Sequence, residues 1–225
     1  MGNIGFRISP FRARPAPDLV RQYDGIATPH ISDNLNRLFG AAAGLRPYHG
    51  NARLLGTALT VRTRPGDNLL VHKAIDMAEP GDVIVVDAGG ELTNAIVGEI
   101  MMRLSIRRGI AGYVIDGAIR DTAAFVRERF PVYARGVTHR GPYKDGPGEI
   151  NVPVSVGGML VHPGDIIVGD EDGVAAVPLQ DAERLLEAIR AQQAREDDIL
   201  RSIADGTVNR SWVDHLLRER GCEFS

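Results

Sequence analysis

The stretch GYVIDGAIRD, residues 112–121, begins with an apolar run and ends with an Arg-Asp pair. Residues 113–116 are rich in β-branched and aromatic side chains, as in a buried strand, and Gly117 ends the run. A helix is predicted to follow from about residue 122 to residue 128. Arg120 and Asp121 therefore stand after a strand and before a helix, where open α/β sheets bind their ligands.

The residues before this stretch have the same organisation. An apolar strand is predicted over residues 83–87, and glycines follow it. A helix is predicted over residues 98–108, because apolar residues recur at the spacing of one helix face. These apolar residues are Val97, Ile100, Met101 and Leu104. The order strand, helix, strand, helix predicts parallel strands with right-handed crossovers. If the two strands are neighbours, the loops that follow them open on one crevice.

Further elements extend this α/β core. Helices are predicted at residues 18–23, from residue 28 through Leu38 and at 68–77, and a strand at 55–62. Short strands separated by Gly and Pro predict a second, mostly β layer; they lie at residues 132–134, 152–156, 159–162, 165–168 and 174–177. A long helix is predicted from residue 179, with a charged continuation at 192–203 and a last helix at 211–219. We predict a single domain over residues 1–225, with a helical arm from about residue 180.

The composition excludes several classes of protein. The formal net charge of −3 provides no field that favours nucleic acid or an anionic membrane. No apolar run is long enough to cross a bilayer, and the single cysteine, Cys222, forms no internal disulfide. We therefore expect a cytoplasmic protein with neither nucleic-acid nor membrane partners.

The predicted crevice has the groups that bind a small oxo-acid. The helix that begins at Gly98 and Glu99 offers unpaired backbone N–H groups to an anion. Arg120 can grip a carboxylate through two parallel hydrogen bonds, and Asp121 is a hard oxygen ligand for Mg²⁺ or Mn²⁺. A structural interpretation is also open, because Arg-Asp pairs often form surface ion pairs and an acidic residue in a first helical turn is stabilising by itself.

Other residue types carry less chemistry. The six histidines lack the spacing of a zinc site, and Cys222 has no evident base partner. Lys73 and Lys144 are the only lysines, and neither is expected at the crevice. This expectation argues against an aldolase that works through a lysine Schiff base.

A resemblance to a known family sharpens the prediction. Glu99, twenty intervening residues and Arg120-Asp121 resemble the acidic-X20-Arg-Asp signature of the RraA-like family, which includes 4-hydroxy-4-methyl-2-oxoglutarate / 4-carboxy-4-hydroxy-2-oxoadipate aldolases. The stretches NVPVSVGG, residues 151–158, and PGDIIVGDEDGV, residues 163–174, are similar to its second signature. The resemblance covers roughly residues 25–205.

This resemblance implies a fold, an assembly and a set of roles. The fold would be a three-layer β/β/α sandwich similar to swivelling phosphohistidine domains, assembled as a homotrimer or a dimer of trimers. Arg120 would bind the pyruvyl carboxylate and oxo groups, Asp121 the divalent metal, and Glu99 would orient a metal-bound water. Glu196 is the best match for an acid supplied by a neighbouring subunit. Backbone contacts to substrate would come from Gly98, Glu99, Ile100 and Met101.

The implied function is a carbon–carbon lyase. It would be a metal-dependent (class II) pyruvate aldolase without an organic cofactor, acting on 4-hydroxy-2-oxo-diacids and also decarboxylating oxaloacetate. Some relatives have an acid where this chain has Ala124, which leaves the substrate preference open. The alternative is an RraA-type regulator that binds and inhibits a ribonuclease. A methyltransferase-like nucleotide binder rests on the glycines after residue 87 alone.

Overall fold

The computed structural model describes residues 4–11 and 13–224. The chain divides into two compact units, Met1–Leu186 and Glu187–Ser225. Residues 1 and 225, which bound the predicted single domain, lie outside the described residues. That the chain forms one domain stays a prediction. None of the helices in the described part of the chain is long and apolar enough to cross a membrane.

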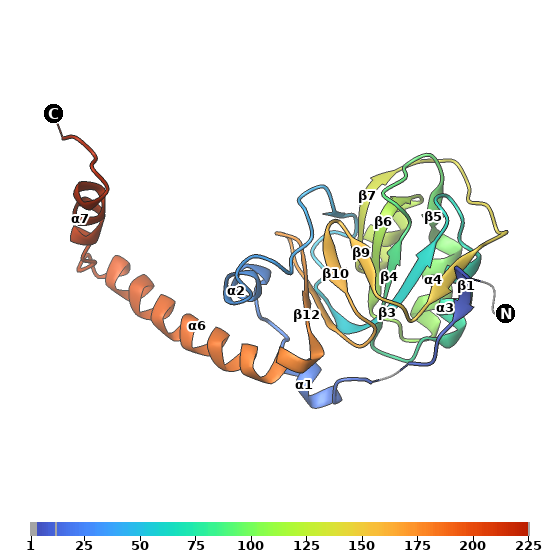
Figure 1. Ribbon diagram of the computed structural model, residues 1–225, viewed down its shortest axis with the longest axis horizontal. Helices are drawn as coiled ribbons and strands as arrows, with labels where there is room; N and C mark the ends of the chain where they lie inside the picture. The colour runs from blue at the N-terminus through green and yellow to red at the C-terminus, as the bar shows by residue number, and fades with distance from the viewer. Residues whose placement is uncertain (1–3, 12, 225) are drawn as a thin grey trace. The chain divides into compact units, whose positions relative to one another are not determined.

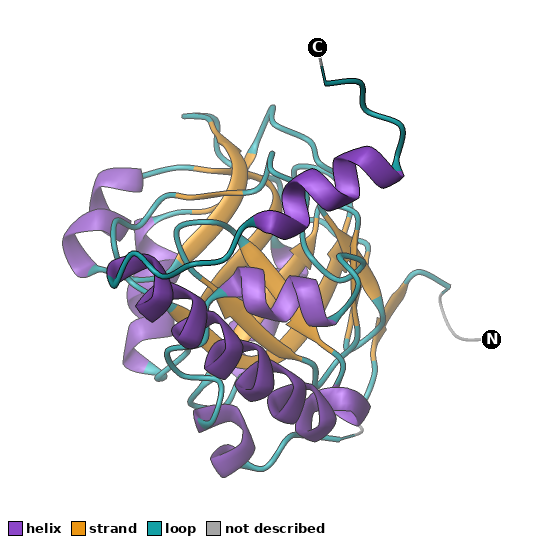
Figure 2. Ribbon diagram, turned by 90° about the vertical axis from the view of Figure 1, so that its left-hand side faces the viewer, coloured by secondary structure: helices purple, strands orange, loops and turns teal. Residues whose placement is uncertain are grey.

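A ten-stranded mixed sheet forms the centre of the first unit (Figure 2). Four parallel strands run through its middle: β3 (Leu54–Thr63), β4 (Asp82–Asp87), β6 (Gly112–Ile119) and β7 (Val132–Val137). The connections between them contain the helices α3 (Leu69–Met77), α4 (Glu99–Arg107) and α5 (Thr122–Glu128). The predicted parallel pairing of the strands at 83–87 and 113–116 is therefore confirmed.

The sheet is buried on both faces, because alternate side chains of its strands enter two different cores. In β4, Ile84 and Val86 pack in the core that includes α3, α4 and α5, whereas Val83 and Val85 pack in the other. This second core also holds the strands β9 (Val154–Val156) and β10 (Met159–Val161), which pair as a separate small sheet. Figure 1 shows β9 and β10 on one side of the main sheet and α3 and α4 on the other. The predicted β/β/α layering is confirmed.

The extent of the second β layer differs from the prediction. Three of its predicted strands, β7, β11 (Ile166–Gly169) and β12 (Val174–Val177), belong to the main sheet instead. β7 pairs in parallel with β6, and β11 and β12 join the sheet because β3 is long. One edge of β3 pairs with β4, and its first four residues are free on the other edge to pair with β11.

Helix α2 (Thr28–Asn34) is shorter than predicted. It ends before Leu38, which is 72% exposed, because Asn36 and Arg37 adopt left-handed backbone conformations with φ of 54° and 61°. The preceding helix, α1 (Pro17–Arg21), matches the prediction closely.

Four short strands were not predicted: β1 (Phe6–Ile8), β2 (Arg46–Pro47), β5 (Ala95–Val97) and β8 (Gly148–Ile150). Of these, β5 positions the candidate site, because it pairs in parallel with the end of β6.

The C-terminal helices are close to the prediction. A short 3₁₀ turn, η1 (Leu179–Asp181), leads into α6 (Ala182–Ala204), and α7 (Ser211–Glu219) follows. In the second unit the apolar side chains of Ile199, Leu200 and Ile203 are more than half exposed.

Candidate active site

The structure brings the start of α4 against the end of β6. The backbone N–H of Arg120 donates to the carbonyl of Val97, with 3.1 Å between nitrogen and oxygen. The backbone N–H of Glu99 donates to the Asp121 carboxylate, with 3.0 Å between nitrogen and Oδ2. The two loops that the sequence placed at one crevice therefore meet through β5.

Gly98 permits this close approach. A Cβ atom at this position would lie 2.5 Å from Asp121 Oδ2 and 3.0 Å from Arg120 Cγ. The backbone of Gly98 is extended, with φ of −155°, so the requirement for glycine is steric and does not come from a left-handed conformation.

Asp121 fits a hard divalent cation held largely by water. The residue is the N-cap of α5 in a left-handed conformation, and its carboxylate is 43% exposed. Oδ2 accepts the Glu99 N–H and lies 3.7 Å from Arg120 Nε, so both contacts use the same carboxylate oxygen. No group of three His, Cys, Asp or Glu side chains suited to a metal exists among the described residues. One carboxylate with several waters is a common arrangement for Mg²⁺.

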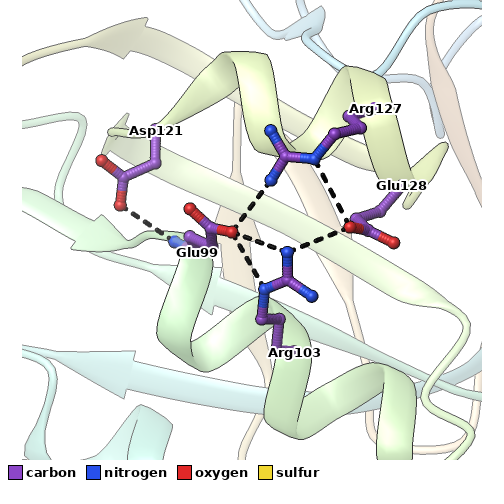
Figure 3. A network of polar contacts seen from close by, with 5 residues as sticks. All are labelled: Glu99, Arg103, Asp121, Arg127 and Glu128. Atoms are coloured by element: carbon purple, nitrogen blue, oxygen red, sulfur yellow. Dashed lines mark hydrogen bonds and ion pairs between the residues drawn. The ribbon is translucent and has the colours of Figure 1, made fainter.

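The Glu99 side chain turns away from Asp121 and into an arginine network (Figure 3). Its Oε1 accepts hydrogen bonds from Arg103 Nε and Arg127 Nη2, each at 2.9 Å. Both arginines also pair with Glu128 Oε1, at 3.1 and 3.6 Å. Glu99 thus reaches Asp121 through its backbone, and its carboxylate links α4 to α5. Its predicted role toward a metal-bound water stays a prediction.

A pocket of about 200 Å³ opens beside the start of α4 and Arg120. Arg120 lines this pocket, and so do three other residues predicted to contact substrate: Gly98, Ile100 and Met101. Several residues without a predicted role also line it. The lining residues are Asn68, His72, Ile96, Val97, Gly98, Ile100, Met101, Arg120, Pro142 and Lys144.

The position of Lys144 corrects an expectation, because this side chain lines the pocket that contains Arg120. The loop after β7 folds back over the site. It is tied there by Ala95 N–H donating to the Arg140 carbonyl at 2.9 Å and by Asn94 Nδ2 donating to the Gly141 carbonyl at 2.6 Å. The other lysine, Lys73, is exposed and does not line the pocket.

His72 was assigned no role from the sequence. Its side chain is half-buried, and burial lowers the pKa of the imidazole below its ordinary value of 6.5. The charge of Lys144 lowers it further, and Asp76 acts in the opposite direction. The ring is therefore mostly neutral near pH 7. No local sequence motif points to His72 or Lys144. The two residues are 72 positions apart in the chain and line one pocket only in the folded structure.

Asp116, which lies within β6, serves the fold. Asp116 is buried; its carboxylate pairs with Arg135 and accepts the Gly157 N–H at 2.8 Å. Its carbonyl also accepts the N–H of Gly90, so the glycines after β4 close onto β6.

Glu196 belongs to α6 in the second unit. Its Oε1 accepts a hydrogen bond from Gln192 Nε2 at 2.7 Å. Its predicted contribution to the site of a neighbouring subunit stays a prediction.

Comparison with known proteins agrees with this fold. The RraA-like family described as Aldolase/RraA matches residues 28–176, and the chain belongs to this family. A protein of Halalkalibacterium halodurans named "Putative 4-hydroxy-4-methyl-2-oxoglutarate aldolase" is 42% identical over 201 residues, 89% of this chain and 96% of the relative. A Thermus thermophilus protein named 4-hydroxy-4-methyl-2-oxoglutarate aldolase is 37% identical over 59% of this chain and 80% of the relative.

The fold is also that of proteins described as regulators. The structure of Streptomyces coelicolor RraAS2, described as an unusual member of the RNase ES inhibitor RraA protein family, superposes with a TM-score of 0.75. It is 29% identical and covers 83% of this chain and 97% of that one. Proteins similar to this chain are therefore named as aldolases in some cases and as ribonuclease inhibitors in others.

Proposed function

We propose that this protein is a divalent-metal-dependent pyruvate aldolase that cleaves 4-hydroxy-2-oxo-diacids such as 4-hydroxy-4-methyl-2-oxoglutarate, and that it also decarboxylates oxaloacetate. The observation that carries the proposal is a small pocket lined by Arg120 and the start of α4, with the Asp121 carboxylate bound to the N–H of Glu99 at that same helix start. The names of the aldolase relatives supply the substrate class.

Arg120 and α4 hold the pyruvyl end of the substrate. The planar guanidinium suits the carboxylate and 2-oxo oxygens of a 2-oxo-acid, which lie in one plane. Ile100 and Met101 are in the first turn of α4, so their backbone N–H groups have no acceptor within the helix. These donors favour negative charge where the helix begins.

Asp121 would hold the cation, which when bound supplies Lewis-acid stabilisation of charge on the 2-oxo oxygen. In the cleavage step the C4 hydroxyl loses its proton to a base, which we propose is a water molecule. The C3–C4 bond breaks as C4 forms a C=O bond and leaves as the second carbonyl product. The electron pair enters the 2-oxo group to give the enolate of pyruvate, beside the positive charge of Arg120. Protonation at C3 releases pyruvate. Decarboxylation of oxaloacetate needs the same stabilisation of the enolate and no base.

A regulatory role is the second candidate, and the structural likeness to RraAS2 favours it. A surface that only binds another protein does not need an arginine that lines a pocket with a half-exposed carboxylate next to it in the chain. The presence of Glu99, Arg120 and Asp121 together therefore favours the enzyme.

The test is release of pyruvate from 4-hydroxy-4-methyl-2-oxoglutarate and from oxaloacetate, with EDTA, Mg²⁺ or Mn²⁺, against protein-free controls. We expect activity that is lost in EDTA and restored by either cation. Asp121→Asn should lose the response to metal while keeping the fold, because asparagine also tolerates the left-handed conformation. Arg120→Lys should lower kcat/KM at least about tenfold, or about 1.4 kcal/mol.

Arg107→Lys is the matched control, since Arg107 lies in the last turn of α4 away from the pocket. Full activity in EDTA would refute the metal dependence. The absence of pyruvate release under every condition would favour the regulator.

A further inference from the structure

The proposed chemistry uses one wall of the pocket and leaves two basic groups unassigned. Lys144 and His72 line the same pocket as Arg120. The loop that carries Lys144 also packs on the guanidinium, because a Cβ atom at Gly141 would lie 3.3 Å from Arg120 Nη1. The pocket is therefore lined by an arginine and a lysine that come from different elements.

Backbone hydrogen bonds hold the residue before Lys144 in place. The N–H of Tyr143 donates to the carbonyl of Gly66 at 2.8 Å, and its carbonyl accepts the N–H of Asn68 at 3.0 Å. Lys144 is exposed, but its backbone is tied to the segment that leads into α3. An exposed lysine on such a support loses less freedom on binding than one on a mobile loop.

The residues after Lys144 are fixed by a buried carboxylate. Asp67 is fully buried, and its Oδ2 accepts the N–H groups of Asp145 and Gly146 at 2.7 and 3.0 Å. Arg64 Nη2 pairs with the same oxygen at 3.1 Å, and Oδ1 accepts the N–H of Leu69. The turn that presents Lys144 is therefore anchored on both sides.

His72 lies on α3 near Lys144, close enough for the ammonium charge to disfavour the imidazolium. A neutral imidazole has one N–H to donate, and an ammonium has three. The two groups together suit a carboxylate, whose two oxygens accept from both. The pocket volume of about 200 Å³ lies below the roughly 300–1,000 Å³ typical of drug-sized ligands and favours a small acid.

We propose that Lys144 and His72 bind the distal carboxylate of the substrate while Arg120 binds the pyruvyl end. They make the protein selective for 2-oxo-diacids over 2-oxo-monoacids. This inference rests on the proposed function, since it assumes that the pocket takes a 2-oxo-acid. It adds the residues that recognise the second acid group.

The test is calorimetric binding of 2-oxoglutarate and of 2-oxopentanoate in the presence of Mg²⁺. These five-carbon acids differ in the distal carboxylate, and neither has the C4 hydroxyl that cleavage requires. We expect wild-type protein to bind the diacid at least about tenfold more tightly, as one charge-assisted contact provides. Lys144→Met should remove most of this preference and change the Kd of the monoacid by less than about twofold.

Three further variants complete the design. Lys144→Arg should restore the preference for the diacid because it keeps the charge. His72→Asn should weaken diacid binding by a smaller factor, again with little change in the Kd of the monoacid. Lys73→Met, at the exposed lysine outside the pocket, should change nothing.

The outcomes separate this inference from the proposed function. A Lys144→Met protein that keeps its diacid preference, or that loses both ligands equally while folded by circular dichroism, overturns the subsite. Selective binding without pyruvate release from any substrate overturns the aldolase and leaves the subsite standing. A wild-type protein that binds neither acid overturns both.

Discussion

The site requires glycine at position 98, because a side chain there would collide with Asp121 and Arg120. A methyl group there would meet the Asp121 carboxylate at 2.5 Å and the Arg120 side chain at 3.0 Å. Because the two neighbours are the groups proposed to hold metal and substrate, any shift that relieves the collision displaces them.

We expect Gly98→Ala to lower kcat/KM for pyruvate release at least about tenfold, since misplacing a catalytic group by a fraction of an ångström is costly. The extended backbone accepts alanine, so the melting temperature should change little. Gly44→Ala is the control, because its Cβ would meet only Arg135 Nη1 at an ordinary 3.7 Å. Wild-type kinetics in Gly98→Ala would show that the close approach does not matter for the reaction.

Among the elements, the connection between β7 and β8 is anchored in part by Asp67, a buried acid just before α3. Burial by itself raises the pKa of Asp67. The N–H groups of Leu69, Asp145 and Gly146 and the charge of Arg64 outweigh it, so the pKa is lowered below 3.8. A carboxyl whose folded pKa is below its unfolded value stabilises the protein above the unfolded pKa. That stabilisation is lost as pH falls through the folded value.

We therefore expect Asp67→Asn to destabilise the protein by about 1–3 kcal/mol at pH 7, because an amide cannot satisfy all the donors that face the carboxylate. The difference from wild type should shrink as the pH falls below about 4. Urea unfolding across this pH range measures it. Since the turn also presents Lys144, the KM for diacids should rise with little change in kcat. A difference in stability that is independent of pH would contradict the role of the charge.

At the scale of the whole molecule, the family resemblance predicts a trimer in which Glu196 serves a neighbouring subunit. The exposed apolar residues Ile199, Leu200 and Ile203 support contact of this helix with another surface. We expect Asp121→Ala and Glu196→Ala proteins to be nearly inactive alone. Unfolded together and reassembled in equal amounts, they should recover roughly a quarter of wild-type activity, because about one interface in four is intact.

Hybrid trimers without recovered activity would contradict the shared site, as would a monomeric protein in solution. If both residues act within one subunit, mixing restores nothing, because every subunit lacks one of them.

The sequence alone determined the central layer of the fold and the placement of Arg120 and Asp121 in the site. Apolar runs and helical spacing within short windows located β4, β6, α4 and α5. The same local pattern placed Arg120 and Asp121 after a strand and opposite a helix start. These features depend on residues close in the chain, where periodicity and turn chemistry act directly.

Only the tertiary structure decided which residues surround Arg120 and Asp121. The Glu99 carboxylate pairs with Arg127, and Lys144 lines the same pocket as His72. The short strand β5, which aligns α4 with Arg120, has three residues and too little pattern to predict. These contacts join segments that are tens of residues apart. They form through backbone hydrogen bonds and packing between elements, for which a single sequence contains no periodic signal.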